Sequence, residues 1–160
     1  MSIKRLSILG LSALSLVFAA QASALTAKQT VEKEVVTVAA DGTQVTTRVP
    51  AELVTPGETV VYTVDFVNDS AAAATDLVLA MPVPADVRYL EGTADRSGAV
   101  VLYSIDGGST FDKRDALALP AVGGGTRPAR SEEITHIQWT IAGPVPVGAS
   151  DSLVFKGRLK

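Results

Sequence analysis

The sequence predicts an all-β fold, an antiparallel β-sandwich of about seven to nine strands preceded by a signal peptide. Three observations lead to this prediction. Runs of alternating apolar and polar residues recur at short spacing, turns rich in Pro and Gly separate them, and no segment has the length and period of a helix. One stretch, residues 53–94, shows this pattern most clearly.

The first strand of this stretch follows a tight turn. Pro56 sets φ for the first central position of a type II turn, and Gly57 accepts the positive φ that the second position requires. Alternation then predicts a strand whose apolar face is made of Val60, Tyr62, Val64 and Phe66. Val61 and Val67 interrupt the polar face, so partial cover is expected on that side. Asn68 ends the strand.

A loop and a second strand complete the stretch. Residues 71–74 are alanines, but four residues are too few for a stable helix, so a loop is expected there. Alternate residues from Leu77 to Met81 share one apolar face. The prolines at positions 82 and 84 end the second strand, because proline has no N–H to donate to a neighbouring strand.

Strands are also expected on both sides of this stretch. Residues 31–38, with charged residues among them, predict an exposed edge strand, and Asp41-Gly42 predicts a hairpin that leads into a strand over residues 45–53. Further strands are expected at residues 87–91, 100–105, 135–141 and 153–159. The basic residues Lys156, Arg158 and Lys160 predict that the last of these is a protected edge strand.

Four of the eight aromatic residues fall on faces that are expected to be inward. They are Tyr62, Phe66, Trp139 and Phe155. Trp139 is expected on a central strand. These residues are interpreted as core, and no exposed aromatic platform for carbohydrate or nucleic acid is expected.

Several of these segments together resemble a known family. The residues concerned are Pro56–Val64, Asn68, Thr75–Val78, Pro82–Ala85 and Tyr89, which are similar to the conserved-repeat domain of bacterial surface proteins, catalogued as domain of unknown function eleven. The resemblance covers the chain from Val54 to Leu159. It implies an immunoglobulin-like sandwich with a structural or surface role, and no catalytic residues. The chain departs from the family pattern at Met81–Asp86 and lacks tandem repeats.

A second, local resemblance lies at Ser104–Phe111. The spacing Ser-x-Asp-x-Gly-x-Thr-aromatic is similar to the Asp-box hairpin of sialidases and other β-proteins. The Asp106 carboxylate can accept backbone N–H groups of its own turn, and glycine permits positive φ. A turn-stabilising role is therefore expected, with calcium or sugar contact as the alternative.

The segment 112–133 is the least regular part of the chain. It contains the run Gly123–Gly125, two prolines and arginines at 127 and 130. Long irregular loops in compact domains are either functional or disordered. A mobile or partner-facing loop is one interpretation, and a flexible connection between the last strands is the other.

The N-terminus has the three parts of a secretory signal peptide. Basic residues at positions 4 and 5 precede an apolar run, which ends at an Ala-x-Ala site. Cleavage is expected after Ala24, with cleavage after Ala22 as the alternative. An uncleaved anchor is the competing interpretation, but the run is short for a membrane span. Residues 1–24 are predicted to be the signal peptide and residues 25–160 a single domain, exported to the periplasm, cell surface or medium.

Composition limits the kinds of partner and of stabilisation. The chain has no cysteine, so an exported domain of this sequence depends on its core rather than on disulfides. Its formal charge is −3, and removing the basic signal residues makes it more acidic. This argues against nucleic acid and anionic membranes as partners. No stretch after the signal peptide is long enough to span a membrane.

Few residues could support catalysis or metal binding. His136 is the single histidine, and it falls on the polar face of an expected strand without a Gly-x-Ser-x-Gly motif elsewhere, so it is interpreted as an ordinary exposed residue. One histidine without cysteine makes a zinc site improbable. Aspartates gather at strand ends, where backbone capping is the ordinary role, although a pair could serve a glycosidase or several could bind calcium.

These observations predict a non-enzymatic structural or protein-interaction module of the bacterial cell envelope, with no cofactor, no metal site and no catalytic residue. Its partner is expected to be another protein or a second copy of the chain, bound through strand edges or end loops. The alternative function is a small-ligand, Ca²⁺ or carbohydrate binder that uses the loops near Asp106 and Gly123.

Overall fold

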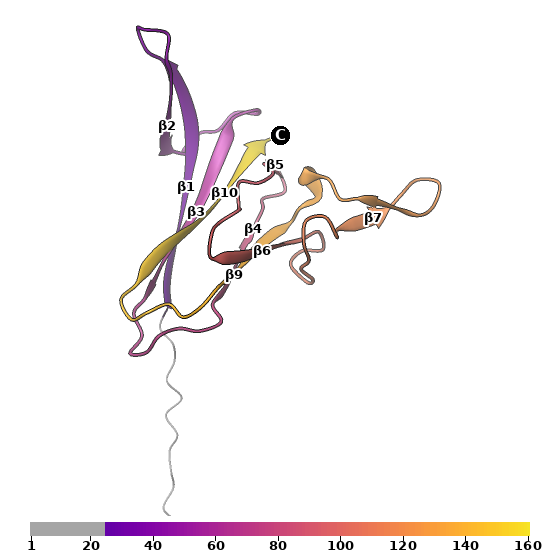
Figure 1. Cartoon of the computed structure of the whole chain (residues 1–160). Helices are drawn as coiled ribbons and strands as arrows, with labels where there is room; N and C mark the ends of the chain where they lie inside the picture. The colour runs from indigo at the N-terminus through magenta and orange to yellow at the C-terminus, as the bar shows by residue number, and fades with distance from the viewer. Residues whose placement is uncertain (1–24) are drawn as a thin grey trace, which may run out of the picture.

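The computed structural model describes residues 25–160, and the predicted signal peptide, residues 1–24, lies outside the described residues. The described chain confirms the all-β prediction (Figure 1). Its strands are β1 (Leu25–Val38), β2 (Gln44–Pro50), β3 (Thr59–Asn68), β4 (Val78–Pro82), β5 (Val87–Tyr89), β6 (Ala99–Ser104), β7 (Ala118–Pro120), β8 (Thr126–Pro128), β9 (His136–Ile141) and β10 (Ser150–Leu159). One 3-10 turn, η1 (Ser131–Glu133), precedes β9.

The strands form two facing antiparallel sheets and a separate hairpin. The larger sheet has the order β2-β1-β3-β10-β5, and the smaller has the order β4-β9-β6. Strands β7 and β8 pair only with each other. The arrangement is sandwich-like, and the described chain has ten strands, one more than the upper end of the predicted range.

The core lies where the smaller sheet faces β3, β10 and β5. Strand β3 buries the predicted face, including Phe66, and its outer residue Val61 is also fully buried. The reason is an ion pair that crosses β3: Lys156 on β10 bonds Glu34 on β1 at 2.5 Å. Because Lys156 lies directly opposite Val61, its aliphatic stem covers the valine. The partial cover expected on this side is confirmed.

Aromatic residues fill the centre of the sandwich. The rings of Tyr62 and Phe155 stack with centroids 4.7 Å apart, and the hydroxyls of Tyr89 and Tyr103 lie 3.1 Å apart. Trp139 on the central strand β9 is fully buried, and its indole N–H donates to the Ala94 carbonyl at 2.9 Å. The inward prediction for the aromatic residues is therefore confirmed, and the hydroxyls of Tyr89 and Tyr103 and the indole N–H of Trp139 have hydrogen-bond partners.

Two edge predictions were wrong. Strand β1 is not an edge but lies between β2 and β3, and it runs over 14 residues rather than eight. Strand β10 lies between β3 and β5, so its basic residues do not protect an edge. Alternation shows which face a residue occupies but carries no information on which strands lie beside it.

The loop before β4 has the predicted irregular form. Asn68, at the end of β3, is almost fully buried and organises this loop. Its side-chain N–H₂ donates to the Val145 carbonyl at 2.8 Å and to the Ala72 carbonyl at 3.0 Å, while its oxygen accepts the Ser70 N–H. The alanine run forms a loop, as expected: the Ala72 carbonyl accepts the Asn68 side chain, and Ala74 pairs with Val145 through its backbone.

Candidate functional site

The hairpin at Ser104–Phe111 is held by its own side chains. The Asp106 carboxylate accepts the amide N–H groups of Ser109 and Thr110 at 3.1 and 3.0 Å, and the Thr110 hydroxyl at 2.6 Å. The Ser104 hydroxyl donates to the same carboxylate at 2.7 Å and accepts the Gly108 N–H. Tyr103 and Asp112 then pair through their backbones on either side of the turn.

This network lowers the pKa of Asp106 well below its usual value, first through the Thr110 hydroxyl, then through the Thr110 amide and Ser104. The carboxylate oxygens are thus used within the turn. The geometry favours the turn-stabilising interpretation over calcium or sugar contact. Among residues 25–160, no group of three or more His, Cys, Asp or Glu side chains is placed to hold a metal ion.

The sequence suggested that His136 is exposed, but in the structure it is partly buried. It begins β9 beneath the Asp106 turn, where a Cβ on Gly108 would fall 3.2 Å from the imidazole ring. Its Nδ1 atom is buried and has no hydrogen-bond partner in the described chain. The sequence did not reveal this, because the turn that covers the ring comes from residues almost thirty positions earlier.

The segment 112–133 is ordered rather than a structureless loop. Leu117 and Ala129 are buried at the base of the β7–β8 hairpin. Arg127 on β8 binds the Glu133 carboxylate through both terminal nitrogens, and the Arg130 N–H donates to the same carboxylate at 2.7 Å. These contacts hold the pKa of Glu133 at about 2. Beyond this base, the hairpin projects from the body and ends in exposed residues 122–125 (Figure 1).

A second projection is formed by β1 and β2. The first half of β1 pairs with β3 as far as Lys33, and the second half pairs only with β2. The hairpin beyond Lys33, residues 34–49, therefore extends past the rest of the larger sheet, at the top of Figure 1. We call it the β1–β2 arm. Its turn is the predicted one: the Asp41 carboxylate accepts the Thr43 N–H at 2.9 Å, and Gly42 has φ of 85°.

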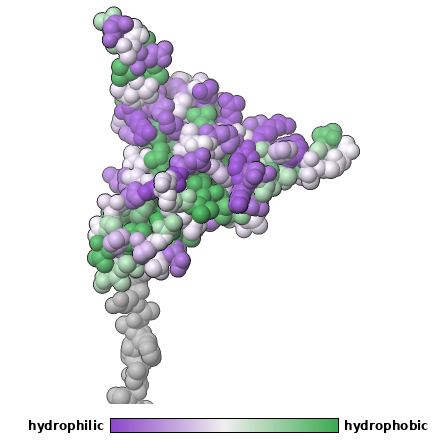
Figure 2. Space-filling view, in the orientation of Figure 1, coloured by the Kyte–Doolittle hydropathy of each residue, from purple (hydrophilic) through white to green (hydrophobic). Residues whose placement is uncertain are grey.

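The β1–β2 arm exposes apolar side chains on both faces. Val36 and Val38 are 56% and 67% exposed, and Val45, on the opposite face, is 44% exposed. Figure 2 shows apolar and polar side chains mixed along the arm. The smaller sheet does not cover the arm, because it packs over β3, β10 and β5.

Strand β2 also has a free backbone edge. The amide of Ala39 donates to the Thr43 carbonyl and the amide of Ala51 donates to the Val31 carbonyl, so odd-numbered residues bond β1. In an antiparallel ladder alternate residues bond opposite neighbours, so the N–H and C=O groups of Gln44, Thr46 and Arg48 point away from β1. In the described chain no other strand pairs with this edge. The free edge ends at Pro50, because proline has no N–H to donate to a further strand.

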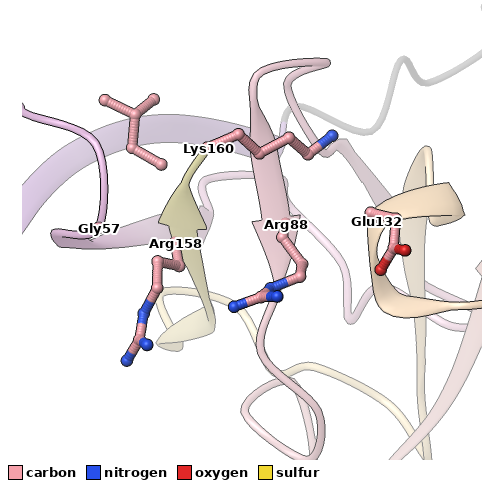
Figure 3. Close-up of a pocket in the computed structure, with 6 residues that line it drawn as sticks. Gly57, Arg88, Glu132, Arg158 and Lys160 are labelled. Carbon is pink, nitrogen blue, oxygen red and sulfur yellow. The ribbon is translucent and has the colours of Figure 1, made fainter.

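A surface cavity of about 470 Å³ lies beside β5 and β10, toward the edge of the larger sheet that is opposite β2 (Figure 3). Its lining residues are Gly57, Arg88, Glu132, Arg158, Leu159 and Lys160. The sequence analysis did not single out this place, because the two arginines that face it are 70 positions apart and meet only when β5 pairs with β10.

No helix among residues 25–160 is both long and apolar enough to cross a membrane. Comparisons with protein-family models, with curated proteins and with solved structures found no match to this chain.

Proposed function

We propose that this chain is an exported, non-enzymatic protein-interaction module of the bacterial cell envelope, and that it binds its partner by strand addition at β2. The observation that carries this proposal is the free edge of β2. An extended segment laid along Gln44, Thr46 and Arg48 gains a row of main-chain hydrogen bonds, and exposed apolar side chains on both faces of the arm supply further contact.

The position of the edge supports this proposal. Free edges on β-proteins are commonly shielded by short strands, charges or bulges. Strand β2 has seven residues, with Arg48 as its single charged side chain, and it extends beyond the body of the domain where a partner can reach it. By contrast, the other edge of the same sheet, β5, has only three residues.

A pair of variants tests strand addition directly. Thr46→Pro with Arg48→Pro removes two outward N–H groups, whereas Thr46→Ala with Arg48→Ala keeps both groups and changes only the side chains. A photo-crosslinking residue at Val45 reports the partner in intact cells. We expect crosslinked species with the parent and the alanine variant and none with the proline variant.

The outcome also identifies the partner. A crosslinked species of twice the mass of one chain shows a second copy, and any other mass shows a different protein. Crosslinking that survives the proline substitutions, with the variant folded, contradicts strand addition. Export is tested separately by mass spectrometry of the protein from the cell envelope and medium, which should begin at Leu25 if cleavage follows Ala24.

A further inference from the structure

Two arginines lie side by side next to the surface cavity. Arg88 on β5 is directly opposite Arg158 on β10, and both side chains are exposed. Backbone bonds on either side hold the two strands: the Leu90 N–H donates to the Lys156 carbonyl and the Lys160 N–H to the Asp86 carbonyl, both at 2.9 Å. The backbone separation of the two arginines is therefore set by the sheet.

This pairing is unfavourable in isolation, because like charges directly opposite each other in a sheet repel. Six other basic residues in the described chain pair with a carboxylate: Lys33, Arg96, Arg114, Arg127, Arg130 and Lys156. No described carboxylate lies within ion-pair distance of Arg88 or Arg158. The two guanidinium groups thus line the cavity without an ion-pair partner among the described residues.

The residues around the two arginines form a concave surface that carries mostly positive charge. Figure 3 shows Arg88 and Arg158 extending from neighbouring strands into the same space, with Lys160 above them. The Lys160 ammonium donates to the Ala85 carbonyl at 2.7 Å, which fixes it at the rim. Glu132 stands across the cavity, and its carboxylate lies 3.6 Å from Arg130.

We propose that Arg88 and Arg158 form a binding site for a phosphate group. A guanidinium presents a planar fork of N–H donors that matches two oxygens of an oxyanion. A carboxylate has two oxygens and one charge, so it satisfies one arginine. A phosphate monoester offers three free oxygens and up to two charges, so it can accept from both forks at once. The proposal does not depend on strand addition at β2.

The test is a titration of the full chain with sodium phosphate, against sodium chloride at equal ionic strength and pH 7. The probe is the NMR signal of each arginine Nε–H group. We expect saturable shifts at Arg88 and Arg158, and affinity about tenfold weaker in Arg88→Gln or Arg158→Gln. Arg48→Gln is the matched control, because Arg48 is an exposed arginine on the same sheet without an ion pair in the described chain.

Three results overturn the proposal. Absence of a saturable shift at either arginine shows that the pair does not bind phosphate. Equal shifts at Arg48 show general screening by ions, and equal saturation by sodium acetate shows that the site is not specific for phosphate. If phosphate binds, sedimentation with phosphatidylglycerol vesicles, against phosphatidylcholine vesicles, separates a lipid headgroup from a soluble phosphate compound as the source.

Discussion

Gly157 and Val87 lie so close that a Cβ atom on Gly157 would fall 2.1 Å from Val87 Cγ1. The contact brings β5 against β10 at the residues next to Arg88 and Arg158. The absence of a side chain at position 157 therefore allows the close approach of β5 to β10 beside the two arginines.

We expect Gly157→Ala to destabilise the domain by about 1–3 kcal/mol, the usual cost of an overpacked core position. Chemical denaturation measures this change. Gly157→Ala should cost less stability in a Val87→Ala background than in the parent, because Val87→Ala removes the methyl groups that clash with the new side chain. Additive losses from the two changes would show that the clash is relieved elsewhere.

Asp106 should make stability depend on pH. Its pKa is lowered by the hydrogen bonds of the turn, so its contribution is complete above the unfolded value of about 3.9 and declines as the pH falls below it. We expect Asp106→Asn to lower the melting temperature at pH 7 and to differ less from the parent at pH 3. Asp115→Asn is the control, since Asp115 is exposed. An equal gap at both pH values would contradict this account.

Asn68 should tolerate little change although it lies at the end of a strand. Asn68→Asp removes the two N–H donors that satisfy the Val145 and Ala72 carbonyls and buries a charge. The expected loss is about 2–4 kcal/mol, because hydrogen bonds to buried Asn68 are lost and a charge is placed at a buried position. Urea unfolding measures it, and the neighbouring Asp69→Asn, at an exposed position, should change stability by less than about 0.5 kcal/mol. Similar effects at both positions would show that the buried bonds contribute little.

Glu133 should determine whether the β7–β8 hairpin stays closed at its base. Glu133→Gln removes the charge that pairs with Arg127 and weakens the acceptor of the Arg130 amide. We expect faster hydrogen exchange at the Arg130 amide and across residues 112–133, with unchanged exchange in β3. Glu132→Gln is the matched control, because its ion pair with Arg130 is longer and more exposed. Unchanged exchange in Glu133→Gln would mean that burial of Leu117 and Ala129 is sufficient.

The sequence by itself determined the fold class and the local faces of the strands. Alternation identified the inward residues of β3 and β9, and the Asp41-Gly42 and Asp106 turns formed as their residue types require. These features depend on neighbours a few positions apart, and so backbone geometry and side-chain period are enough to predict them.

Only the tertiary structure decided which strands are neighbours. It placed β1 and β10 inside the larger sheet, left β2 at its edge, covered His136 with the Asp106 turn and brought Arg88 beside Arg158. Each of these results depends on pairing between distant segments, and local pattern is the same for a central and an edge strand when one face is buried. Both proposed binding places, the β2 edge and the arginine pair, come from that pairing, which is why sequence patterns alone did not locate them.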